Sequence, residues 1–193
     1  MHLDPRDRNG TSPTDSFVTD RKTGTTELVN LRPNGKHAKA GGFSPTISRN
    51  GRYVAYLSSS IRLDPEDTNK GVDVYRRNLD RRRSIWVSSS YAGELVRGDF
   101  RDPTISADGA SVAFAARANG LTPVGLPDMW HTYVHEVAAH LTTIASVSHT
   151  EQAVYGGLSP AISSDGQHVV FSSDATNLVP TPTDGFNAYR RSR

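Results

Sequence analysis

The sequence reads Ser44-Pro45-Thr46-Ile47-Ser48-Arg49-Asn50-Gly51-Arg52-Tyr53-Val54-Ala55-Tyr56, and this pattern returns twice further along the chain. The copies are Asp102-Pro103-Thr104-Ile105-Ser106-Ala107-Asp108-Gly109-Ala110-Ser111-Val112-Ala113-Phe114 and Ser159-Pro160-Ala161-Ile162-Ser163-Ser164-Asp165-Gly166-Gln167-His168-Val169-Val170-Phe171. The spacing is 58 residues from Ser44 to Asp102 and 57 residues from Asp102 to Ser159. A short unit that repeats in this way cannot bury its apolar face alone and must stack on its own copies. The repeat therefore predicts a fold of tandem units.

Each unit is expected to contain four short antiparallel strands, as residues 41–97 illustrate. Residues 43–48 and 53–57 predict the first two strands, with a tight hairpin turn at Asn50-Gly51, because Asn-Gly and Asp-Gly accept the positive φ of such turns. A polar loop that opens with Leu63-Asp64-Pro65 follows, and Leu-x-Pro recurs at this place in every copy. Residues 73–79 alternate with period two and predict a third strand, and residues 84–88 predict a fourth.

Four-stranded antiparallel units in tandem are typical of the blades of a β-propeller, an all-β fold. The predicted strands group as two, four, four and three, which makes thirteen strands and about three and a quarter blades. The expected divisions are a partial blade at 1–40, blades at 41–97 and 98–155, and a partial blade at 156–193. Because propellers close with about four to eight blades, we expect an incomplete propeller of three to four blades. No part of the sequence shows helical periodicity.

The composition excludes several classes of protein. Among the 193 residues, 22% are charged and 35% are hydrophobic, which indicates a turn-rich folded chain rather than a disordered one. No stretch approaches the roughly 20 apolar residues of a transmembrane helix, and the charged residues 1–9 do not form a signal peptide. We therefore expect no membrane insertion. Cysteine is absent, which excludes disulfides, thiol nucleophiles and thiolate metal sites.

The arginines gather at two places, although the net charge is only +2. Single-stranded nucleic acids stack on aromatic side chains between the basic ones, and this interleaving is missing here. We therefore expect no nucleic-acid partner and interpret the clusters as a solvated outer strand with its turn. The residues concerned are Arg76, Arg77, Arg81, Arg82, Arg83, Arg190, Arg191 and Arg193.

The repeat resembles the TolB-type β-propeller repeat over nearly the whole chain. The resemblance is carried by Ser-Pro-x-Ile-Ser-x-Asp-Gly-x-x-Val-x-Phe at 159–171, by Asn-Leu-Val-Pro at 177–180 and by Arg21-Lys22-Thr23-Gly24-Thr25-Thr26. Proteins with such repeats include periplasmic interaction partners in envelope complexes, propeller domains of oligopeptidases and many bacterial proteins. The resemblance implies a propeller and an extracytoplasmic or periplasmic location, and it leaves the activity open.

Catalytic chemistry is not indicated by any motif. The chain has no Gly-x-Ser-x-Gly elbow and no phosphate-binding glycine loop. His131 and His135 fall on a predicted strand, where residues four apart are roughly 13 Å from each other, too far to share a metal with His140. We therefore expect a non-enzymatic chain without a resident metal or cofactor. Trp86 and Trp130 are interpreted as packing between blades, with a carbohydrate platform as the alternative.

The acids of the Leu-x-Pro loops are the better candidates for binding. Oxygen donors at alternating positions can hold calcium, and they can also cap their own backbone in Asx turns. Weak calcium candidates on this basis are Asp4, Asp7 and Asn9. The loops between strands two and three share one end of the blades with the connectors that enter strand one. Ligand or partner residues are therefore expected along that rim, at Ser44, Asp64, Asp67, Asn69, Arg101, Asp102, Ser159 and Asp184.

The sequence thus favours a non-catalytic binding or scaffold module that contacts a protein or peptide through its loop face or its open ends. Two alternatives stay open. One is the propeller portion of a larger, oligopeptidase-like hydrolase, and the other is a carbohydrate-binding propeller. Open blade edges also predict that the chain either associates with itself or forms part of a longer protein.

Overall fold

In the residues that it describes, the computed structural model has thirteen strands in four antiparallel sheets. It describes residues 3–7, 14–38, 40–94, 96–123, 125–148, 150, 152–154, 156–181 and 183–192. We number the sheets as blades 1 to 4. Their strands are β1 (Phe17–Thr19) and β2 (Thr26–Leu28); β3 (Phe43–Ile47), β4 (Tyr53–Ser58), β5 (Asp73–Asn78) and β6 (Arg83–Trp86); β7 (Gly98–Ile105), β8 (Ser111–Ala118), β9 (His131–Glu136) and β10 (Leu141–Ile144); and β11 (Leu158–Ile162), β12 (His168–Ser173) and β13 (Asn187–Ser192).

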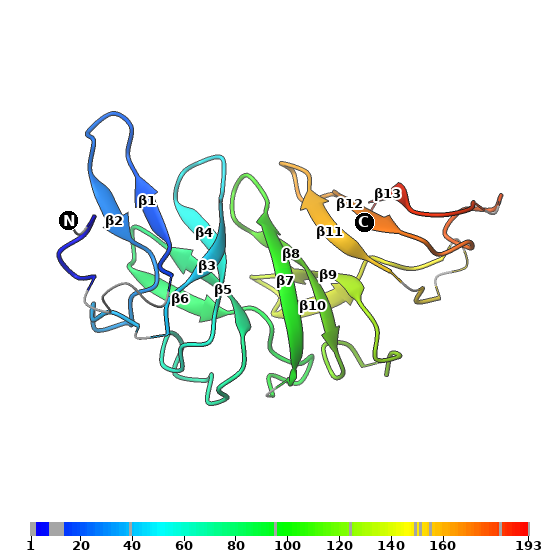
Figure 1. Ribbon diagram of the computed structural model, residues 1–193, viewed down its shortest axis with the longest axis horizontal. Coiled ribbons are helices and arrows are strands. Elements are labelled where there is room, and N and C mark those ends of the chain that lie inside the picture. The colour runs from blue at the N-terminus through cyan, green and yellow to red at the C-terminus, as the bar shows by residue number, and fades with distance from the viewer. Residues whose placement is uncertain are drawn as a thin grey trace.

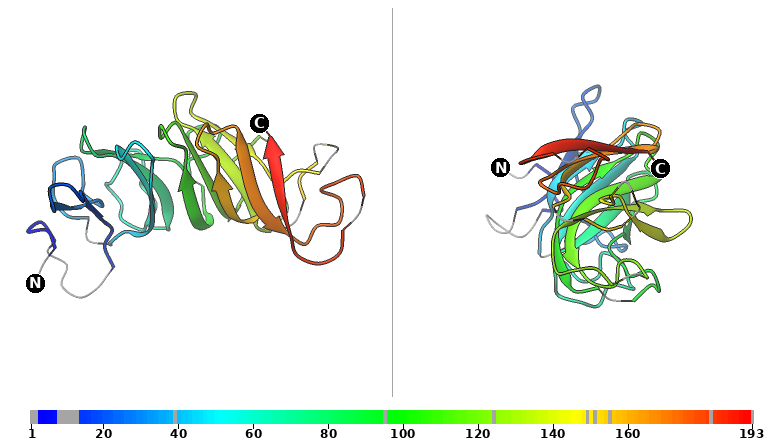
Figure 2. Two further views of the ribbon diagram at one scale, coloured as in Figure 1. Left: turned by 90° about the horizontal axis from the view of Figure 1, so that it is seen from above. Right: turned by 90° about the vertical axis from the view of Figure 1, so that its right-hand side faces the viewer.

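The blades stand side by side in chain order and form an open arc (Figures 1 and 2). Within blades 2 and 3 each strand pairs with the next in sequence, and the first strand, β3 or β7, lies at one edge. β7 also contacts β3 and β11, so the first strands of blades 2 to 4 line the inner side of the arc. Among the described residues no sheet closes the arc into a ring and no helix occurs.

The hydrophobic core is divided among the junctions between blades. Tyr56 and Tyr75 of blade 2 pack with Val29 and Ala38 of blade 1. Further clusters fill the next two junctions. Between blades 2 and 3 they include Ala55, Leu57, Val74, Phe100, Val112, Phe114 and Tyr133, and between blades 3 and 4 they include Ala113, Val134, Val169, Phe171 and Tyr189. Each blade is therefore held by its neighbours, as the repeat predicted.

The turns between first and second strands link neighbouring blades. The backbone N–H of Asn50 donates to the carbonyl of Ala107 over 3.2 Å, and Ala107 N–H donates to Ser164 over 2.9 Å. Gly109, at φ 74°, lies directly against the Tyr53 ring, where an added Cβ would come within 2.3 Å of the ring. The Asp-Gly pair thus serves both the positive φ of the turn and the close approach of two blades.

The strand grouping of two, four, four and three is confirmed, and so is the all-β, open propeller. Each sheet lies within one of the four predicted divisions, whose boundaries stay a prediction. The interpretation of the arginines is wrong in part. Arg81, Arg82 and Arg83 are exposed, but Arg77 is buried and its Nη1 donates to the carbonyl of Leu31 in blade 1 over 3.1 Å. Arg76 stacks on Tyr53, with Cζ 3.9 Å from the ring centroid.

Candidate functional site

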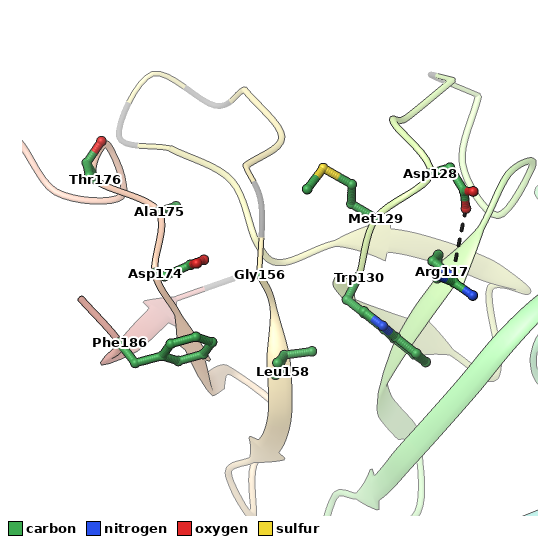
Figure 3. A pocket seen from close by; sticks show the side chains of 10 residues that line it. All are labelled: Arg117, Asp128, Met129, Trp130, Gly156, Leu158, Asp174, Ala175, Thr176 and Phe186. Carbon is green, nitrogen blue, oxygen red and sulfur yellow. Dashed lines mark ion pairs between the residues drawn. The ribbon is translucent and has the colours of Figure 1, made fainter. Parts of the chain in front are cut away.

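A cavity of about 570 Å³ opens where blades 3 and 4 meet on the loop face, the end of the arc formed by the loops between strands two and three (Figure 3). We call it the Trp130 cavity. It is lined by Arg117, Asp128, Met129, Trp130, Gly156, Leu158, Asp174, Ala175, Thr176 and Phe186. These residues lie at the ends of β8 and β12 and just before β9, β11 and β13.

The walls of the Trp130 cavity are largely apolar. Trp130 directly precedes β9 and Phe186 directly precedes β13, so the two aromatic side chains come from the same position of successive repeats. Leu158, the first residue of β11, lies between them in Figure 3. Met129 and Phe186 are exposed. An exposed apolar lining of this kind on a rigid scaffold is typical of a binding site rather than of core packing.

Charged groups surround this apolar lining. Arg117 Nη2 lies 2.5 Å from a carboxylate oxygen of Asp99, and Arg117 Nε lies 3.9 Å from Asp128. Asp174 faces the cavity from the opposite blade (Figure 3). The guanidinium of Arg101 lies over Trp130, with Cζ 3.8 Å from the ring centroid. Arg101, one of the predicted binding residues, is thus placed against the cavity wall, and it orients the indole ring.

Two other cavities lie on the loop face and take in three of the predicted residues. Asp64 and Asp67 line one of about 510 Å³, at the junction of blades 1 and 2, together with Arg32 and Arg62. Asn69 lines another of about 590 Å³, between the long loop of blade 2 and the connector to blade 3. The structure therefore places Asp64 and Asp67 together in one cavity of the expected face and Asn69 in another.

The aspartates of the Leu-x-Pro loops hold the fourth strand of their own blade. Asp4 Oδ2 accepts from the backbone N–H of Leu28 over 2.8 Å, and Asp64 Oδ2 accepts from Trp86 N–H over 3.1 Å. Asp64 Oδ1 also accepts from Glu66 N–H, which is the Asx turn considered from the sequence. The Arg6 guanidinium, which donates to Asp4, holds the pKa of that carboxyl well below its usual range. Asn9, the third calcium candidate, lies outside the described residues.

Asp67 and Asp73 belong to a buried polar network in blade 2. Asp67 accepts from the Tyr75 hydroxyl and from Asn69 N–H, and Asp73 accepts from Trp86 Nε1 over 2.9 Å. Burial raises the pKa of both carboxyls. Trp86 is thus buried and hydrogen-bonded, as expected for packing between blades, and is not available as a carbohydrate platform.

Three of the predicted rim residues form a repeated backbone feature. Ser44, Asp102 and Ser159 all have positive φ, between 46° and 53°, and each precedes a proline. The pairing of the first strand with the second shifts register at each of these places, which is a β-bulge. All three side chains are exposed. Asp184 is exposed as well, and its carbonyl accepts from Asn187 Nδ2 over 3.0 Å.

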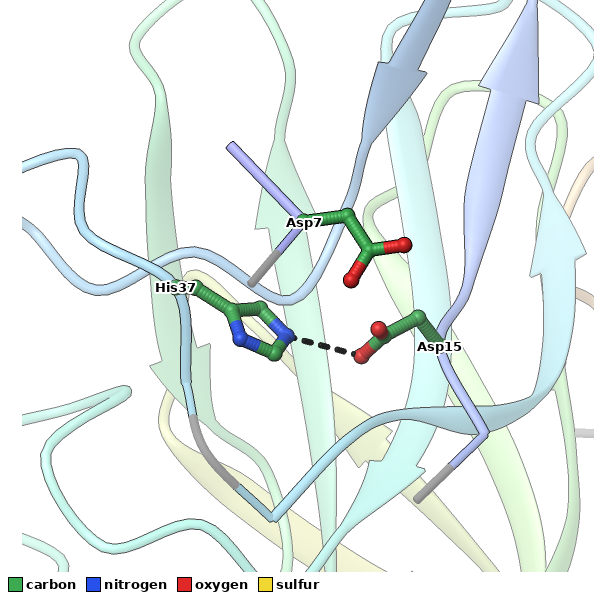
Figure 4. A group of neighbouring side chains, drawn as sticks. All are labelled: Asp7, Asp15 and His37. Atoms are coloured by element: carbon green, nitrogen blue, oxygen red, sulfur yellow. Dashed lines mark hydrogen bonds and ion pairs between the residues drawn. The ribbon is translucent and has the colours of Figure 1, made fainter. Parts of the chain in front are cut away.

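One cluster with metal-binding potential has no motif in the sequence. Asp7, Asp15 and His37 offer ligand atoms that all lie within 4.8 Å of one another (Figure 4). His37 Nε2 lies 2.9 Å from Asp15 Oδ1, and Asn30 Nδ2 donates to the same oxygen over 2.7 Å. Asp7, Asp15 and His37 could bind a divalent cation only if the contacts of Asp15 with His37 and Asn30 were broken.

The repeat explains why His37 faces Asp15. Asp15 and Asp73 are equivalent, since each lies two residues before the aromatic residue that pairs with Leu28 or Trp86. Trp86 donates to Asp73, but Leu28 has no side-chain donor, so His37 supplies one in blade 1. The equivalent position in blade 3 is His131, which is buried, and burial lowers its pKa.

No family model and no curated protein matches the chain. Solved structures do match. Oligogalacturonate lyase in complex with manganese matches 96% of this chain and 43% of its own at 10% identity, with a TM-score of 0.55. The tricorn protease matches 91% of this chain and 15% of its own at 17% identity, with a TM-score of 0.50. TolB from Acinetobacter baumannii matches 81% of this chain and 42% of its own at 14% identity, with a TM-score of 0.30.

The chain therefore spans less than half the length of these proteins. At such identities the likeness to the lyase and to the tricorn protease shows the fold alone. In the described part of the chain no helix has the length and apolar character that a membrane span requires. The β-propeller fold that the TolB-like repeats predicted is confirmed.

Proposed function

We propose that this chain is a non-catalytic binding module that holds an extended segment of a protein or peptide in the Trp130 cavity. The observation that carries the proposal is the placement of two aromatic side chains, Trp130 and Phe186, on adjoining blades around an apolar floor. Interfaces draw most of their binding energy from a few such aromatic anchors. An extracytoplasmic location is part of this proposal and is supported by the resemblance of the repeats to TolB-type proteins.

The charges at the cavity suit a peptide. Arg117, Asp128 and Asp174 provide both donors and acceptors at its rim, as the polar groups of a peptide backbone require. Arg101 lies on the Trp130 ring. Because sugars stack on an open aromatic face, this contact leaves only the opposite face of Trp130 for a carbohydrate. The hydrolase alternative has no specific observation in its favour, since the likeness to peptidases shows the fold alone.

Selection from a random peptide library displayed on phage tests the proposal, followed by affinity measurement with the enriched peptides. Phe186→Ala should weaken binding about tenfold or more, because an aromatic anchor contributes about 1–2 kcal/mol or more. Tyr91→Ala is the matched control, since Tyr91 is an exposed aromatic residue outside the cavity. Trp130 fluorescence in a Trp86→Phe background should change on binding.

Failure to enrich any peptide would contradict the proposal. Equal losses of affinity in Phe186→Ala and Tyr91→Ala would also contradict it, because binding would then not depend on the cavity.

A further inference from the structure

The cavity of about 510 Å³ at the junction of blades 1 and 2 has two arginines in its lining, Arg32 and Arg62, and we call it the Arg32 cavity. Arg32 belongs to the connector between blades 1 and 2, and Arg62 belongs to the loop between β4 and β5. Among the described residues neither guanidinium has a hydrogen-bond or ion-pair partner. Two positive charges of this cavity are therefore unpaired.

The Nε group of Arg32 is buried without an acceptor. A buried donor that has lost its bond to water and gained no other is costly, and such groups are rare in folded proteins. Arg76 and Arg101 also have a buried Nε without an acceptor, but their guanidiniums lie on aromatic rings. Arg32 has no ring contact in the part of the chain that the structure describes. An acceptor in the cavity would remove the cost of burying this donor.

The backbone of Arg62 has an unusual conformation. Its φ is 82°, a value that glycine adopts readily and that other residues adopt only with strain. The equivalent residue of blade 3 is Gly120, at φ 93°, since each directly precedes the leucine of Leu-x-Pro. Glycine would therefore suit this place in blade 2 as well. A strained arginine there indicates a role for its side chain, which lines the Arg32 cavity.

The two aspartates of the lining do not neutralise the arginines. Asp64 accepts two backbone N–H groups, over 3.0 and 3.1 Å. Asp67 accepts one backbone N–H and the Tyr75 hydroxyl. Each of the four carboxylate oxygens therefore has a donor within blade 2. The guanidiniums of Arg32 and Arg62 are left for an anion that enters the cavity.

The rest of the lining selects the kind of anion. Pro33, Ile61 and Pro65 supply apolar surface in the same cavity. A guanidinium binds a carboxylate through two parallel hydrogen bonds, and an apolar wall suits the body of an organic acid. Phosphate fits less well, because it would bring a second negative charge close to Asp64 and Asp67.

We propose that the Arg32 cavity binds the carboxylate of an organic acid between the guanidiniums of Arg32 and Arg62, with the apolar part of the acid against Ile61 and the two prolines. The carboxylate belongs either to a free acid or to the C-terminus of a peptide, and separate probes distinguish these sources. The site lies at a different junction from the Trp130 cavity and does not depend on the function proposed for that cavity.

The test is a titration of the whole, isotope-labelled chain with hexanoate, followed through the arginine Nε–H signals in NMR spectra. The signals of Arg32 and Arg62 are assigned by their loss in Arg32→Gln and Arg62→Gln. The Arg32 signal should shift to saturation with hexanoate but not with hexanamide, which has the same apolar body and no charge. Arg32→Gln should weaken the binding of hexanoate about tenfold or more, because hydrogen bonds between charged groups are lost.

Arg62→Gly separates binding from folding. It should weaken binding about tenfold and leave the melting temperature unchanged or raise it, because glycine adopts this φ without strain. Arg82→Gly is the matched control, since Arg82 is an exposed arginine at φ 51° on the turn between β5 and β6, outside the cavity. It should leave the affinity for hexanoate unchanged. Phe186→Ala should leave it unchanged as well, so that this proposal and the one for the Trp130 cavity fail separately.

The tripeptide Gly-Ala-Leu and its C-terminal amide identify the source of the carboxylate. Tighter binding of the tripeptide than of hexanoate would support a peptide C-terminus, and the reverse would support a free acid. Absence of a saturable shift with both acids would overturn the proposal, and so would equal shifts with hexanamide or tighter binding of inorganic phosphate. Equal losses of affinity in Arg62→Gly and Arg82→Gly would also overturn it.

Discussion

Blade 3 is covered on both faces by other blades, whereas blade 4 is covered on one, and equivalent residues differ accordingly. Ala113 of β8 is 0% exposed, and its counterpart Val170 in β12 is 41% exposed. The first strands of blades 2 and 3 show the same contrast between equivalent residues. Ile105 of β7 is 8% exposed, but Ile47 of β3 is 49% exposed, because the described residues of blade 1 form no strands opposite β3. The same repeat residue therefore stabilises the fold only where a neighbouring blade lies against it.

The largest expected effect comes from the isoleucine pair. Ile105→Ala should lower the free energy of unfolding by about 2–5 kcal/mol, since it leaves a cavity at the junction of blades 2 and 3. Ile47→Ala should cost less than about 1 kcal/mol, because most surface substitutions have small effects. Urea denaturation of both variants measures the difference. Equal costs would show that the junctions do not determine stability.

Lowering the pH should reduce the free energy of unfolding by nearly as much, because blade 3 contains a buried histidine. His135 of β9 is buried, and burial lowers the pKa of its imidazole from 6.5 to about 4. Between these values the unfolded chain binds the proton and the folded chain does not. This group should therefore cost about 3 kcal/mol of stability as the pH falls from about 6.5 to about 4, and nothing further below that.

The comparison with His135→Asn isolates this contribution from the carboxyls that titrate in the same range. Denaturation at several pH values should give a flatter profile for the variant. A profile as steep as that of the wild type would mean that folding does not lower the pKa of His135, which would contradict this prediction.

The smallest effect concerns two equivalent turns. Gly51 and Gly109 both have positive φ, at 70° and 74°, but an added Cβ meets nothing at Gly51 and the Tyr53 ring at Gly109. Gly51→Ala should cost about 1 kcal/mol from backbone strain alone, and Gly109→Ala about 2 kcal/mol or more. Thermal unfolding distinguishes the two variants, and equal melting temperatures would argue against the close contact of blades 2 and 3 at this turn.

The fold could be predicted because local rules and the repeat agree. Asp108-Gly109 gives the turn, the alternation at 73–79 gives the third strand, and the spacing of the copies gives the stacking. The arginines were misjudged because period-two alternation does not tell which of two faces meets another blade. Arg77 is buried at a junction that depends on Leu31, far away in sequence.

The binding face could be predicted, but not its cavities. Strand order alone places Arg101 and Asp67 at the same end of the blades. The Trp130 cavity depends on Trp130 and Phe186 lining the same junction from two blades, and neither residue belongs to the conspicuous repeat motif. The pairing of Asp15 with His37 was missed for the same reason, although the absence of a tryptophan at Leu28 could have indicated that Asp15 needs another donor.

Native-state hydrogen exchange, resolved by strand, tests most directly the claim that blades are stable only against their neighbours. The account predicts the slowest exchange in β7, β8 and β9, which lie between two blades, and much faster exchange in β1, β2 and β13 at the ends of the arc. Uniform protection across all four sheets, or greater protection of β13 than of β8, would contradict it.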